Sequence, residues 1–464
     1  MFQRLLILVL FVGWLGRSIA APHIVLVVTD DQRPDTVHSL GNPHISTPNL
    51  DRLVREGVSF SQAFCSFPLC VPSRAEILTG KVGWRNGVYE GRSRLKPDSV
   101  FVGDALRKQG YETVYCGKWM NDGKPLTRGY DRTKALFSSG GAGKEGKAIL
   151  LDDAGREITG YRGWTFKDEQ GKAELDKGIG VVAETSEYIA DGAVDVLKEE
   201  RDKPLFLHVN FTAPHDPLIV PKSLKNRYPP SSMRLPPNFL SQHPFDHGNL
   251  TGRDERLLPL PRDPEEVKEL LSRYYAVIEE MDKQFGRIME TLRSEPYRGN
   301  TVVIFTSDHG LGMGSHGLLG KQNMYEHTMR VPFIMSGPGM KKGTTSDSMV
   351  ILRDLFPTLV DWAGGPVPEG LDGRSLLNLF RSDAPEWRDH ITGMFYDHQR
   401  MIRTDRWKFI WYPKLDRLQL FDLKEDPSEL NNLHDQVTNA SLVKNLKRRL
   451  IKEFQSLGDP LVQE

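Results

Sequence analysis

Four apolar segments of this chain each end in a pair of polar residues. Residues 23–29 (HIVLVVT) form an unbroken β-branched run, which is typical of a parallel strand buried on both faces. Similar strands are predicted over residues 111–116, 204–212 and 301–306. The polar pairs that follow the four strands are Asp30-Asp31, Gly117-Lys118, Pro214-His215 and Asp308-His309. Because ligands of parallel sheets bind at the carboxyl ends of the strands, we expect all four pairs to meet at one edge of a sheet.

Helical segments alternate with these strands as far as residue 380. The alternation predicts an α/β fold with a large, mixed but mostly parallel, doubly wound sheet that is flanked by helices. Residues 120–180 and 213–264 lack periodicity, and we expect them to form long loops of the kind that wall a site. The predicted helices cover residues 48–56, 73–79, 100–109, 181–200, 264–292 and 351–363, and a further strand covers residues 331–335.

The pattern changes after about residue 380. Residues 407–412 and 418–421 are predicted to be antiparallel strands, and a helix is predicted from Ala440. We therefore expect a main domain over residues 21–380 and a smaller C-terminal α+β subdomain, with an antiparallel sheet, over residues 381–464.

The first 20 residues have the composition of a secretory signal peptide. Arg4 precedes an apolar run over residues 5–15, and Ser18-Ile19-Ala20 is a small-x-small cleavage site. The apolar run is short for a membrane-spanning helix, although an uncleaved anchor is the alternative interpretation. We expect residues 1–20 to be removed, so that the mature chain is periplasmic or secreted and has no stable membrane insertion.

The charges of the chain balance, with 61 Lys and Arg residues against 61 Asp and Glu residues. A basic surface for nucleic acid or a polybasic membrane clamp is therefore not expected. Only three cysteines are present, at positions 65, 70 and 116, which excludes a disulfide scaffold. Cys65 and Cys116 are interpreted either as a bonded pair or as separate buried thiols.

The segment Cys70-Val71-Pro72-Ser73-Arg74, followed by Leu78-Thr79-Gly80, carries the sharpest chemical signal. Pro72 opens a predicted helix, so that Cys70 lies at the helix N-terminus. That end has free backbone N–H groups and a partial positive charge, which suit an anion. Arg74 adds a fork of donors that matches a tetrahedral oxyanion. The alternative, a plain buried cysteine before a helix, fits poorly in a chain that otherwise uses few cysteines.

Asp30, Asp31 and Asp308 bring three carboxylates to two predicted strand ends. Like charges gathered in one place need a cation, and oxygen ligands select a hard divalent ion. Ca²⁺ is the first expectation and Mg²⁺ the second. His309 is a further candidate ligand, although a nitrogen is an unusual donor to Ca²⁺.

With these residues, the sequence resembles the formylglycine-dependent sulfatases of the alkaline phosphatase superfamily. The similarity extends from Asp30 to the segments Phe421-Asp422-Leu423 and Asp426-Pro427-Ser428-Glu429. It implies that Cys70 is oxidised to formylglycine (3-oxoalanine) by a maturating enzyme, and that the hydrate of the aldehyde is the nucleophile. It also implies a cation that is bound by Asp30, Asp31, Asp308, His309 and the modified residue 70.

The resemblance implies roles for four further side chains, which are Arg74, Lys118, His215 and Lys321. Arg74 and the cation would neutralise charge on the sulfate oxygens. Lys118 and Lys321 would stabilise the charge that develops on the sulfuryl group and the leaving oxygen. Either His215 or Lys321 would protonate the departing alcohol.

One position departs from the family pattern. Many members carry His two residues after the Lys of the Gly-Lys-Trp motif, where this chain has Met120. We expect His309 to take over the contact with the nucleophile or the sulfate, since many members have Asn at its position. This combination is similar to the iduronate-sulfatase-like and carbohydrate-sulfatase branch of the family.

Candidate substrate-binding residues follow the Cys70 helix or lie near Lys321. Trp84, Arg92 and Arg94 could stack on a sugar or meet its acidic groups, but a solvated charged loop explains them equally well. His316 is a candidate as well, and packing near a strand end is the alternative interpretation.

The chain is therefore expected to be an exported sulfuric ester hydrolase that removes sulfate from a sulfated carbohydrate. A phosphodiesterase or phosphonate monoester hydrolase that uses the same site is the first alternative, because tetrahedral oxyanions present similar charges to Arg and Lys. A binding protein for sulfated glycans, with Cys70 left as a thiol, is the second alternative.

Overall fold

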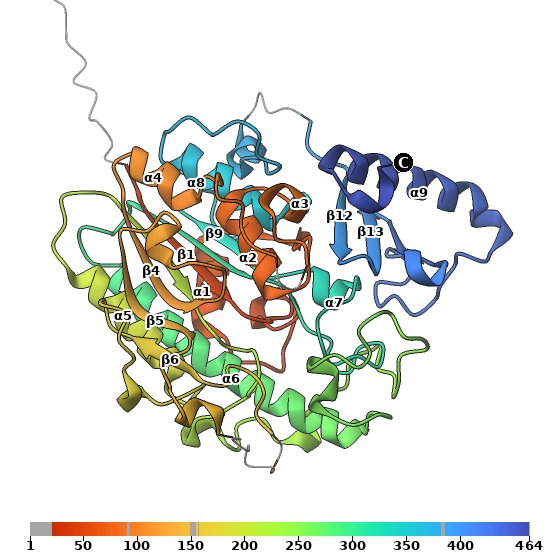
Figure 1. Ribbon diagram of the computed structural model, residues 1–464, viewed down its shortest axis with the longest axis horizontal. Helices are drawn as coiled ribbons and strands as arrows, with labels where there is room; N and C mark the ends of the chain where they lie inside the picture. The colour runs from red at the N-terminus through yellow and green to blue at the C-terminus, as the bar shows by residue number, and fades with distance from the viewer. Residues whose placement is uncertain (1–20, 91–92, 149–154, 156, 382–385, 464) are drawn as a thin grey trace, which may run out of the picture.

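The computed structural model describes residues 21–90, 93–148, 155, 157–381 and 386–463. Residues 1–20, for which a signal peptide is predicted, lie outside the described residues. Within the described residues the strands form a nine-stranded, a two-stranded and a four-stranded sheet (Figure 1). The order in the large sheet is β10-β2-β9-β8-β1-β7-β4-β5-β6. Its strands are β1 (His23–Thr29), β2 (Val58–Phe60), β4 (Glu112–Trp119), β5 (Arg132–Ser139), β6 (Trp164–Lys167), β7 (Leu205–Asn210), β8 (Thr301–Ser307), β9 (Phe333–Ser336) and β10 (Thr344–Ser346).

Strand β1 lies in the middle of the large sheet and is parallel to both of its neighbours, β7 and β8. Strands β4 and β5 continue in the same direction, whereas β6 and β9 run antiparallel to their neighbours. The predicted mixed, mostly parallel sheet is therefore confirmed. The polar residues that follow β1, β7 and β8 leave the sheet at one edge, because these strands are parallel and in register.

Helices cover both faces of the large sheet (Figure 1). On one face pack α1 (Pro48–Glu56), α5 (Thr185–Lys198) and α6 (Pro264–Thr291), and on the other pack α2 (Cys70–Thr79), α4 (Val102–Lys108) and α8 (Leu355–Trp362). The short helices α3 (Gly83–Asn86) and α7 (Glu326–Met329) and the strands β3 (Ala63–Phe64) and β11 (Val350–Ile351) complete this part of the chain. The arrangement explains the unbroken apolar run of β1, since both of its faces are covered.

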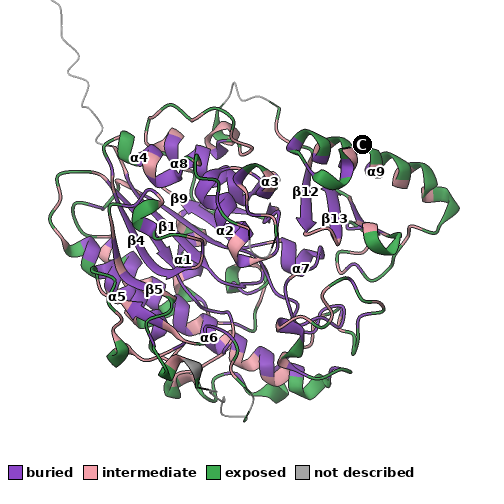
Figure 2. Ribbon diagram, in the orientation of Figure 1, coloured by how far each residue is buried: buried purple, intermediate pink, exposed green. Residues whose placement is uncertain are grey.

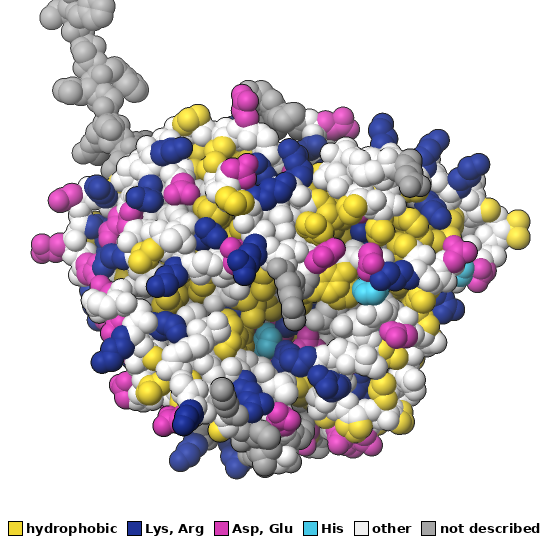
Figure 3. All heavy atoms as spheres, in the orientation of Figure 1, with side chains coloured by type: hydrophobic (Ala, Val, Ile, Leu, Met, Phe, Trp, Pro, Cys, Tyr) yellow, Lys and Arg dark blue, Asp and Glu magenta, His cyan; other side chains and the backbone are white. Residues whose placement is uncertain are grey.

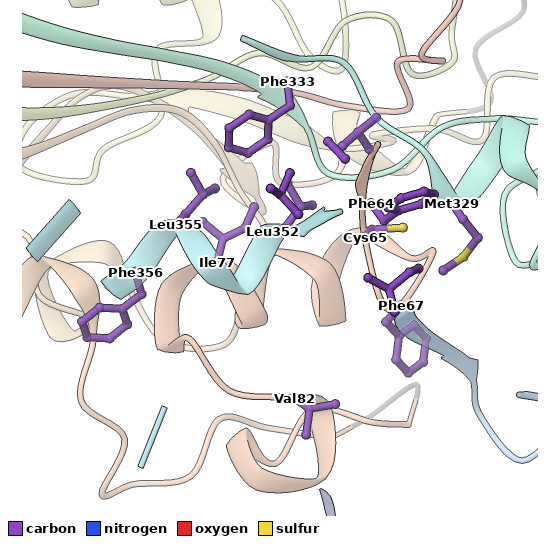
Figure 4. Close-up of a cluster of buried hydrophobic side chains, with 14 of the residues drawn as sticks. Phe64, Cys65, Phe67, Ile77, Val82, Met329, Phe333, Leu352, Leu355 and Phe356 are labelled. Atoms are coloured by element: carbon purple, nitrogen blue, oxygen red, sulfur yellow. The ribbon is translucent and has the colours of Figure 1, made fainter. Parts of the chain in front are cut away.

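The two faces of the sheet form two hydrophobic clusters. Ile24 and Leu26 of β1 contribute to the cluster on the α2 side, and Val25 and Val27 contribute to the cluster on the α6 side. The sheet and the helix sides that face it are buried in Figure 2. Figure 4 shows part of the α2-side cluster, which includes Phe64, Cys65, Phe67, Ile77, Phe333 and Leu355.

The cysteines lie on opposite sides of the sheet. Cys65 belongs to the α2-side cluster and Cys116 to the α6-side cluster, so the sheet separates them. All three cysteines are within the described residues, and all are buried free thiols. Of the two interpretations of Cys65 and Cys116, the structure therefore has the separate thiols.

The C-terminal part forms its own antiparallel sheet, as predicted. Its strands are β12 (His390–Phe395), β13 (Gln399–Thr404), β14 (Trp407–Tyr412) and β15 (Arg417–Asp422), in that order. Helix α9 (Ala440–Leu457) packs on β13 and β14. Figure 3 shows acidic and basic side chains interspersed on one face of the molecule, so this face presents no single-sign field.

Three expectations about elements need correction. Residues 120–180 are not a continuous loop, because they contain β5 and β6 at one side of the large sheet. The alternating burial of β5 is hidden in the sequence by Arg132 and Lys134, whose side chains are half-buried near the sheet edge. Helix α2 begins at Cys70 and not at Ser73, and β9 is shifted by two residues from the predicted strand.

Gly117 interrupts the pairing of β4 with β5 immediately before Lys118. Its φ is 87°, and a Cβ atom there would collide with the carbonyl oxygen of Asn210 on β7. Gly110 also has a φ of 87°, but a Cβ atom there would meet nothing within 4 Å. The two glycines thus share one backbone conformation and differ in the space around them.

We predict that Gly117→Ala lowers the free energy of unfolding by about 3 kcal/mol or more, since backbone strain and a collision with β7 add together. Gly110→Ala is the matched control, and should lower it by about 1 kcal/mol, which is the cost of the backbone conformation alone. Urea unfolding of both variants measures the difference. Equal losses would show that the close approach to Asn210 does not constrain the sheet.

Candidate active site

The carboxylates of Asp30, Asp31 and Asp308 meet at the ends of β1 and β8. Thr29 is paired with Ser307, so the residues that follow emerge side by side. The backbone N–H of Asp31 donates to Asp308 Oδ1 at 3.2 Å. Asp31 has a φ of 68°, and this left-handed conformation turns the chain sharply after the strand. All three carboxylates are almost completely buried, so their charges need partners.

Cys70 lies directly against this group, at the first residue of α2. Its Sγ is 3.3 Å from Asp30 Oδ1 and 3.4 Å from His309 Nε2. Burial raises the pKa of the Cys70 thiol well above its usual value, and the charge of Asp30 adds to the effect. The unmodified side chain is therefore a neutral thiol that donates to Asp30, and not a thiolate nucleophile.

Arg74, one turn further along α2, holds the end of β8. Its Nε donates to Asp308 Oδ2 at 2.9 Å, and its Nη1 donates to Asn210 Oδ1 at 2.6 Å. Ser73 Oγ donates to the backbone oxygen of Asp308 at 2.6 Å. The helix that carries Cys70 is thus fastened to three strand ends, β1, β7 and β8, because Arg74 also donates to the backbone oxygen of Thr29.

Two buried lysines pair with the remaining carboxylates. Lys118 Nζ is 2.5 Å from Asp30 Oδ2, and Lys321 Nζ is 2.9 Å from both oxygens of Asp31. Burial disfavours the charged form of Asp30, but the positive charges of Lys118 and its neighbours outweigh burial and hold the pKa of Asp30 well below its usual value. For Lys321, Asp254 and Asp31 outweigh burial and raise the pKa.

His215 faces the same cluster of carboxylates from the loop that follows β7. Its Nε2 is 3.8 Å from Asp31 Oδ2. Its Nδ1 is 2.6 Å from the backbone oxygen of Asp216, and Arg253 Nη2 lies 3.3 Å from Nε2. These two contacts fit the neutral tautomer that carries its proton on Nδ1. Burial and the charge of Lys321 lower the pKa of His215 to about 4.

Four side chains have ligand atoms close enough to hold one metal ion. The atoms of Asp30, Asp31, Cys70 and His309 all lie within 4.8 Å of one another. Burial raises the pKa of Asp31 well above its usual value, and Lys321 offsets the burial only in part. The carboxylates of Asp30, Asp308 and Asp254 raise the pKa of Asp31 further, which indicates a surplus of negative charge around it. A donor set dominated by carboxylate oxygen fits a hard divalent cation.

Asp308 and His309 differ in how they reach this group. Asp308 is predicted as a metal ligand, and it lies beside the group with Arg74 as its partner. His309 Nε2 points at the Cys70 sulfur, while its Nδ1 lies 3.0 Å from the backbone oxygen of Gly310. Burial lowers the pKa of His309 to about 4. A neutral imidazole therefore faces the Cys70 sulfur, and its substitution for the histidine absent at Met120 stays a prediction.

Several residues of the site were not predicted. The hydroxyl of Tyr161 donates to Asp30 Oδ2, and its ring lies 4.7 Å from that of His215. Asp216 forms a forked ion pair with Arg253 at 2.7 and 2.8 Å. Asp254 lies 3.9 Å from Lys321 Nζ. Tyr161, Arg253 and Asp254 fall in the two segments without periodicity, so no sequence signal marked them.

Comparison with known proteins decides the family. The sulfatase family model matches residues 22–365, and the model for the C-terminal region of N-sulphoglucosamine sulphohydrolase matches residues 314–456. The chain belongs to the sulfatase family. It is a sulfuric ester hydrolase of the alkaline phosphatase superfamily, in the carbohydrate-sulfatase branch.

Two curated relatives and one solved structure illustrate the similarity. An arylsulfatase of Clostridium perfringens is 31% identical over 94% of each chain. An N-acetylglucosamine-6-O-sulfatase of Bacteroides thetaiotaomicron is 27% identical, over 94% of this chain and 86% of the relative. A protein solved in complex with its substrate D-glucosamine-2-N,6-O-disulfate has a TM-score of 0.76 at 24% identity, over 96% of this chain and 100% of that chain, and shares the fold.

Two of the four residues predicted to read the substrate of this sulfatase have other partners. Trp84 packs edge-on against Phe454 of α9, at 5.4 Å between ring centres. His316 stacks on Tyr325 at 3.9 Å. Arg94 is exposed, and Arg92 lies outside the described residues. A role in substrate binding remains a prediction for these four residues.

A cavity of about 480 Å³ lies beside His215. Leucine and proline account for half of its sixteen lining residues. Asp216 and Arg253, which contact His215, are among the five charged residues that line it, and residues 157–159 line it as well. Its apolar lining residues are Ile158, Pro214, Pro217, Leu218, Leu257, Leu258, Pro259, Leu270, Leu311 and Met313.

The packing of His316 generates a prediction about pH. Its Nε2 is 3.0 Å from the backbone oxygen of Glu429, so the proton sits there, and the Asn238 amide faces Nδ1. Burial lowers the pKa of His316 to about 4, below the value near 6.5 of an unfolded histidine. The unfolded chain thus binds the extra proton more readily. The stability that His316 contributes is complete above pH 6.5 and is lost as pH falls towards 4.

We predict that the free energy of unfolding falls between pH 7 and pH 5, and that the fall is about 1–2 kcal/mol smaller in His316→Phe than in the wild-type protein. The phenyl ring keeps the stacking on Tyr325 but cannot titrate. Urea unfolding at the two pH values measures this. An unchanged pH dependence, together with a raised KM, would instead assign His316 to substrate binding.

Proposed function

We propose that this sulfatase removes sulfate from a sulfated carbohydrate, with residue 70 as formylglycine and a bound divalent cation, Ca²⁺ before Mg²⁺. The observation that carries the proposal is the position of Cys70, at the N-terminus of α2 and within hydrogen-bond reach of Asp30 and His309. The curated relatives support the substrate class, since one of them is an N-acetylglucosamine-6-O-sulfatase and another an ulvan-active sulfatase.

The buried thiol of Cys70 is neutral and therefore a poor nucleophile, and oxidation to formylglycine would replace it. The hydrated aldehyde, when present, supplies an oxygen nucleophile where the sulfur now lies. His309 Nε2, 3.4 Å from that position, carries no proton because Nδ1 faces the Gly310 backbone oxygen, so its lone pair is directed at the nucleophile and the proposed cation. Because Cys70 is almost completely buried, little water reaches this position and the surrounding charges are weakly screened.

The proposed cation ligands are Asp30, Asp31, Asp308, His309 and residue 70. A divalent cation there supplies positive charge to the sulfate oxygens and acidifies the nucleophile. Asp308 would take part through Oδ1, which accepts from the backbone N–H groups of Asp31 and His309, because Arg74 engages Oδ2. The ligand atoms of Asp30, Asp31, Cys70 and His309, all within 4.8 Å of one another, support a cation at this position.

Arg74, Lys118 and Lys321 surround the nucleophile with fixed positive charge. Each is buried and held by a carboxylate, so none has to reorganise when charge develops on the sulfuryl group. Of the two candidates for protonating the departing alcohol, Lys321 fits better. His215 is neutral near pH 7 with its proton directed at Asp216, whereas Lys321 stays an ammonium. We therefore assign proton donation to Lys321 and substrate orientation to His215.

We further propose that the chain is exported, with residues 1–20 as a signal peptide, residues 21–380 as the catalytic domain and residues 381–464 as the C-terminal subdomain. The maturating enzyme that converts Cys70 is a transient partner of this chain. The sulfatase itself is periplasmic or secreted. No helix of the described residues combines the length and apolarity needed to cross a membrane.

The first test is the mass of the peptide that contains Cys70, from protein made with its maturation machinery. Conversion of –CH₂SH to –CHO lowers the mass by about 18 Da. We expect this loss, sulfate release from sulfated sugars, and no turnover in Cys70→Ala. Cys116→Ala, which removes a buried thiol on the other side of the sheet, should remain active.

Two outcomes would contradict the proposal. An intact thiol in a protein that hydrolyses an aryl phosphate diester faster than any sulfate ester would make the enzyme a phosphodiesterase or phosphonate monoester hydrolase. Converted protein that binds sulfated glycans and leaves them unaltered would be a binding protein.

Metal removal is the second test. Dialysis against a chelator should abolish sulfate release, and Ca²⁺ should restore it. Added Ca²⁺ should also raise the unfolding temperature, since a ligand at 100 times its Kd stabilises the native state by about 2.7 kcal/mol. Asp31→Asn should lose this shift. Asp282→Asn, which alters a buried carboxylate that binds the start of α1, should keep it. A Ca²⁺ shift that survives in Asp31→Asn would refute the ligand set.

A further inference from the structure

Lys321 lies in a segment without regular secondary structure. Residues 321–325 connect the end of the β8 loop to α7, and no helix or strand includes them. Within the segment, the Asn323 amide donates to the backbone oxygen of Lys321 at 2.8 Å. The ammonium nevertheless has to stay at 2.9 Å from both oxygens of Asp31. Something outside the segment must therefore fix its path.

The C-terminal sheet supplies contacts to this segment from three neighbouring strands. The Gln399 amide, on β13, donates to the backbone oxygens of Gln322 and His247, both at 3.0 Å. Lys408 Nζ, on β14, donates to the backbone oxygen of Met324 at 3.0 Å. Gln399 and Lys408 are fully buried, so water does not compete for these two side-chain donors.

The end of the segment is held as firmly. Lys408 Nζ also lies 2.7 Å from Glu326 Oε1 and 2.8 Å from Glu429 Oε1, and the Glu326 backbone N–H donates to Glu429 Oε2 at 2.7 Å. The Gln419 side chain, on β15, pairs with the Tyr325 hydroxyl at 3.0 Å. Residues 322, 324, 325 and 326 are thus each fastened to a side chain of the C-terminal part.

We propose that the C-terminal sheet positions the Lys321 ammonium, and that Gln399 is the positioning residue closest to it. Gln399 holds the backbone oxygen of Gln322, the residue that follows Lys321. The same amide also holds the backbone oxygen of His247, and nearby Asn249 donates to the Gln322 side chain. The inference rests on the proposed role of Lys321 as the donor to the leaving oxygen. It makes the C-terminal subdomain a part of the catalytic apparatus, although no side chain of it has to touch the substrate.

Proton donation by Lys321 tolerates only a small displacement of its ammonium group. A displacement of about 1 Å at a reacting group can cost about 100-fold in rate. A segment without helix or strand hydrogen bonds has no internal means to resist such a displacement, and its carbonyls are fixed only by the donors that they meet. Loss of the Gln399 amide leaves the backbone oxygens of Gln322 and His247 without this donor, and the segment would shift to find another.

The test compares Gln399→Met with Asp459→Asn. Met matches the length of Gln but has no donor. Asp459 pairs with Arg400, the residue after Gln399, whose side chain lies on the opposite face of the sheet against Phe454 of α9. Asp459→Asn therefore loosens the same subdomain without touching residues 321–325. Both variants are first compared by their thermal unfolding midpoints.

The readout is kcat for phenyl sulfate and for 4-nitrophenyl sulfate, whose leaving group needs less proton donation. If Gln399 acts through Lys321, Gln399→Met should lose about 10-fold to 100-fold on phenyl sulfate and about 3-fold or less on 4-nitrophenyl sulfate. Asp459→Asn should keep the wild-type ratio of the two rates. Equal losses on both substrates would overturn the inference.

A double-mutant cycle and a crystal structure complete the test. In a Lys321→Ala background, Gln399→Met should cause no further loss, and a loss that multiplies with that of Lys321→Ala would overturn the inference. In the crystal structure of Gln399→Met, Lys321 Nζ should lie away from Asp31, and an unchanged distance would also overturn it. This last measurement needs no turnover, so it separates a failure of the inference from a failure of the proposed sulfatase substrate.

Discussion

The structure of the site follows from the need to compensate buried negative charge. Parallel pairing of β1 with β8 puts the carboxylates of Asp30, Asp31 and Asp308 side by side, where water does not reach them. Removing one partner of a buried ion pair costs about 3–5 kcal/mol, so each carboxylate holds in place the basic side chain that faces it. These side chains are Arg74 on α2, Lys118 on β4 and Lys321 on the segment before α7. The arrangement of catalytic groups and the stability of the sheet edge are therefore one property of the molecule.

Much of this was accessible from the sequence because strand ends and helix starts have local signatures. The apolar run before Asp30, the run before Asp308 and the Pro72 turn each predicted an element within a few residues of its observed bounds. Parallel strands must then bring their carboxyl ends together, so the meeting of Asp30, Lys118 and Asp308 at one edge followed from topology, whereas the ion pair of Lys118 with Asp30 was not predicted. The roles of His215 and Lys321 came from the family resemblance, and of the two only His215 was marked by its place after a predicted strand.

What the sequence did not predict depends on contacts between distant segments. Tyr161 and Arg253 lie in stretches without periodicity, and only the folded chain brings them to Asp30 and Asp216. Strand β5 was missed because a strand near a sheet edge carries charged residues on its half-exposed face. Trp84, in α3, packs against Phe454 of α9, a contact that no local pattern predicts, and its role in stacking on a sugar stays a prediction.

The central place of β1 also has a consequence for the order of events during synthesis. Asp31 and Asp308 are 277 positions apart, and the two strands that pair with β1 both come later in the chain, β7 before the midpoint of the sequence and β8 after it. At 5–20 residues per second, β1 emerges from the ribosome roughly 14–55 s before β8 exists to pair with it. During that interval one of the most apolar segments of the protein has at least one unpaired edge, which is the state in which chains associate with one another. A truncated chain that ends before β8 would keep this edge unpaired, and its aggregation would reflect the topology of the sheet and not a defect in any single contact.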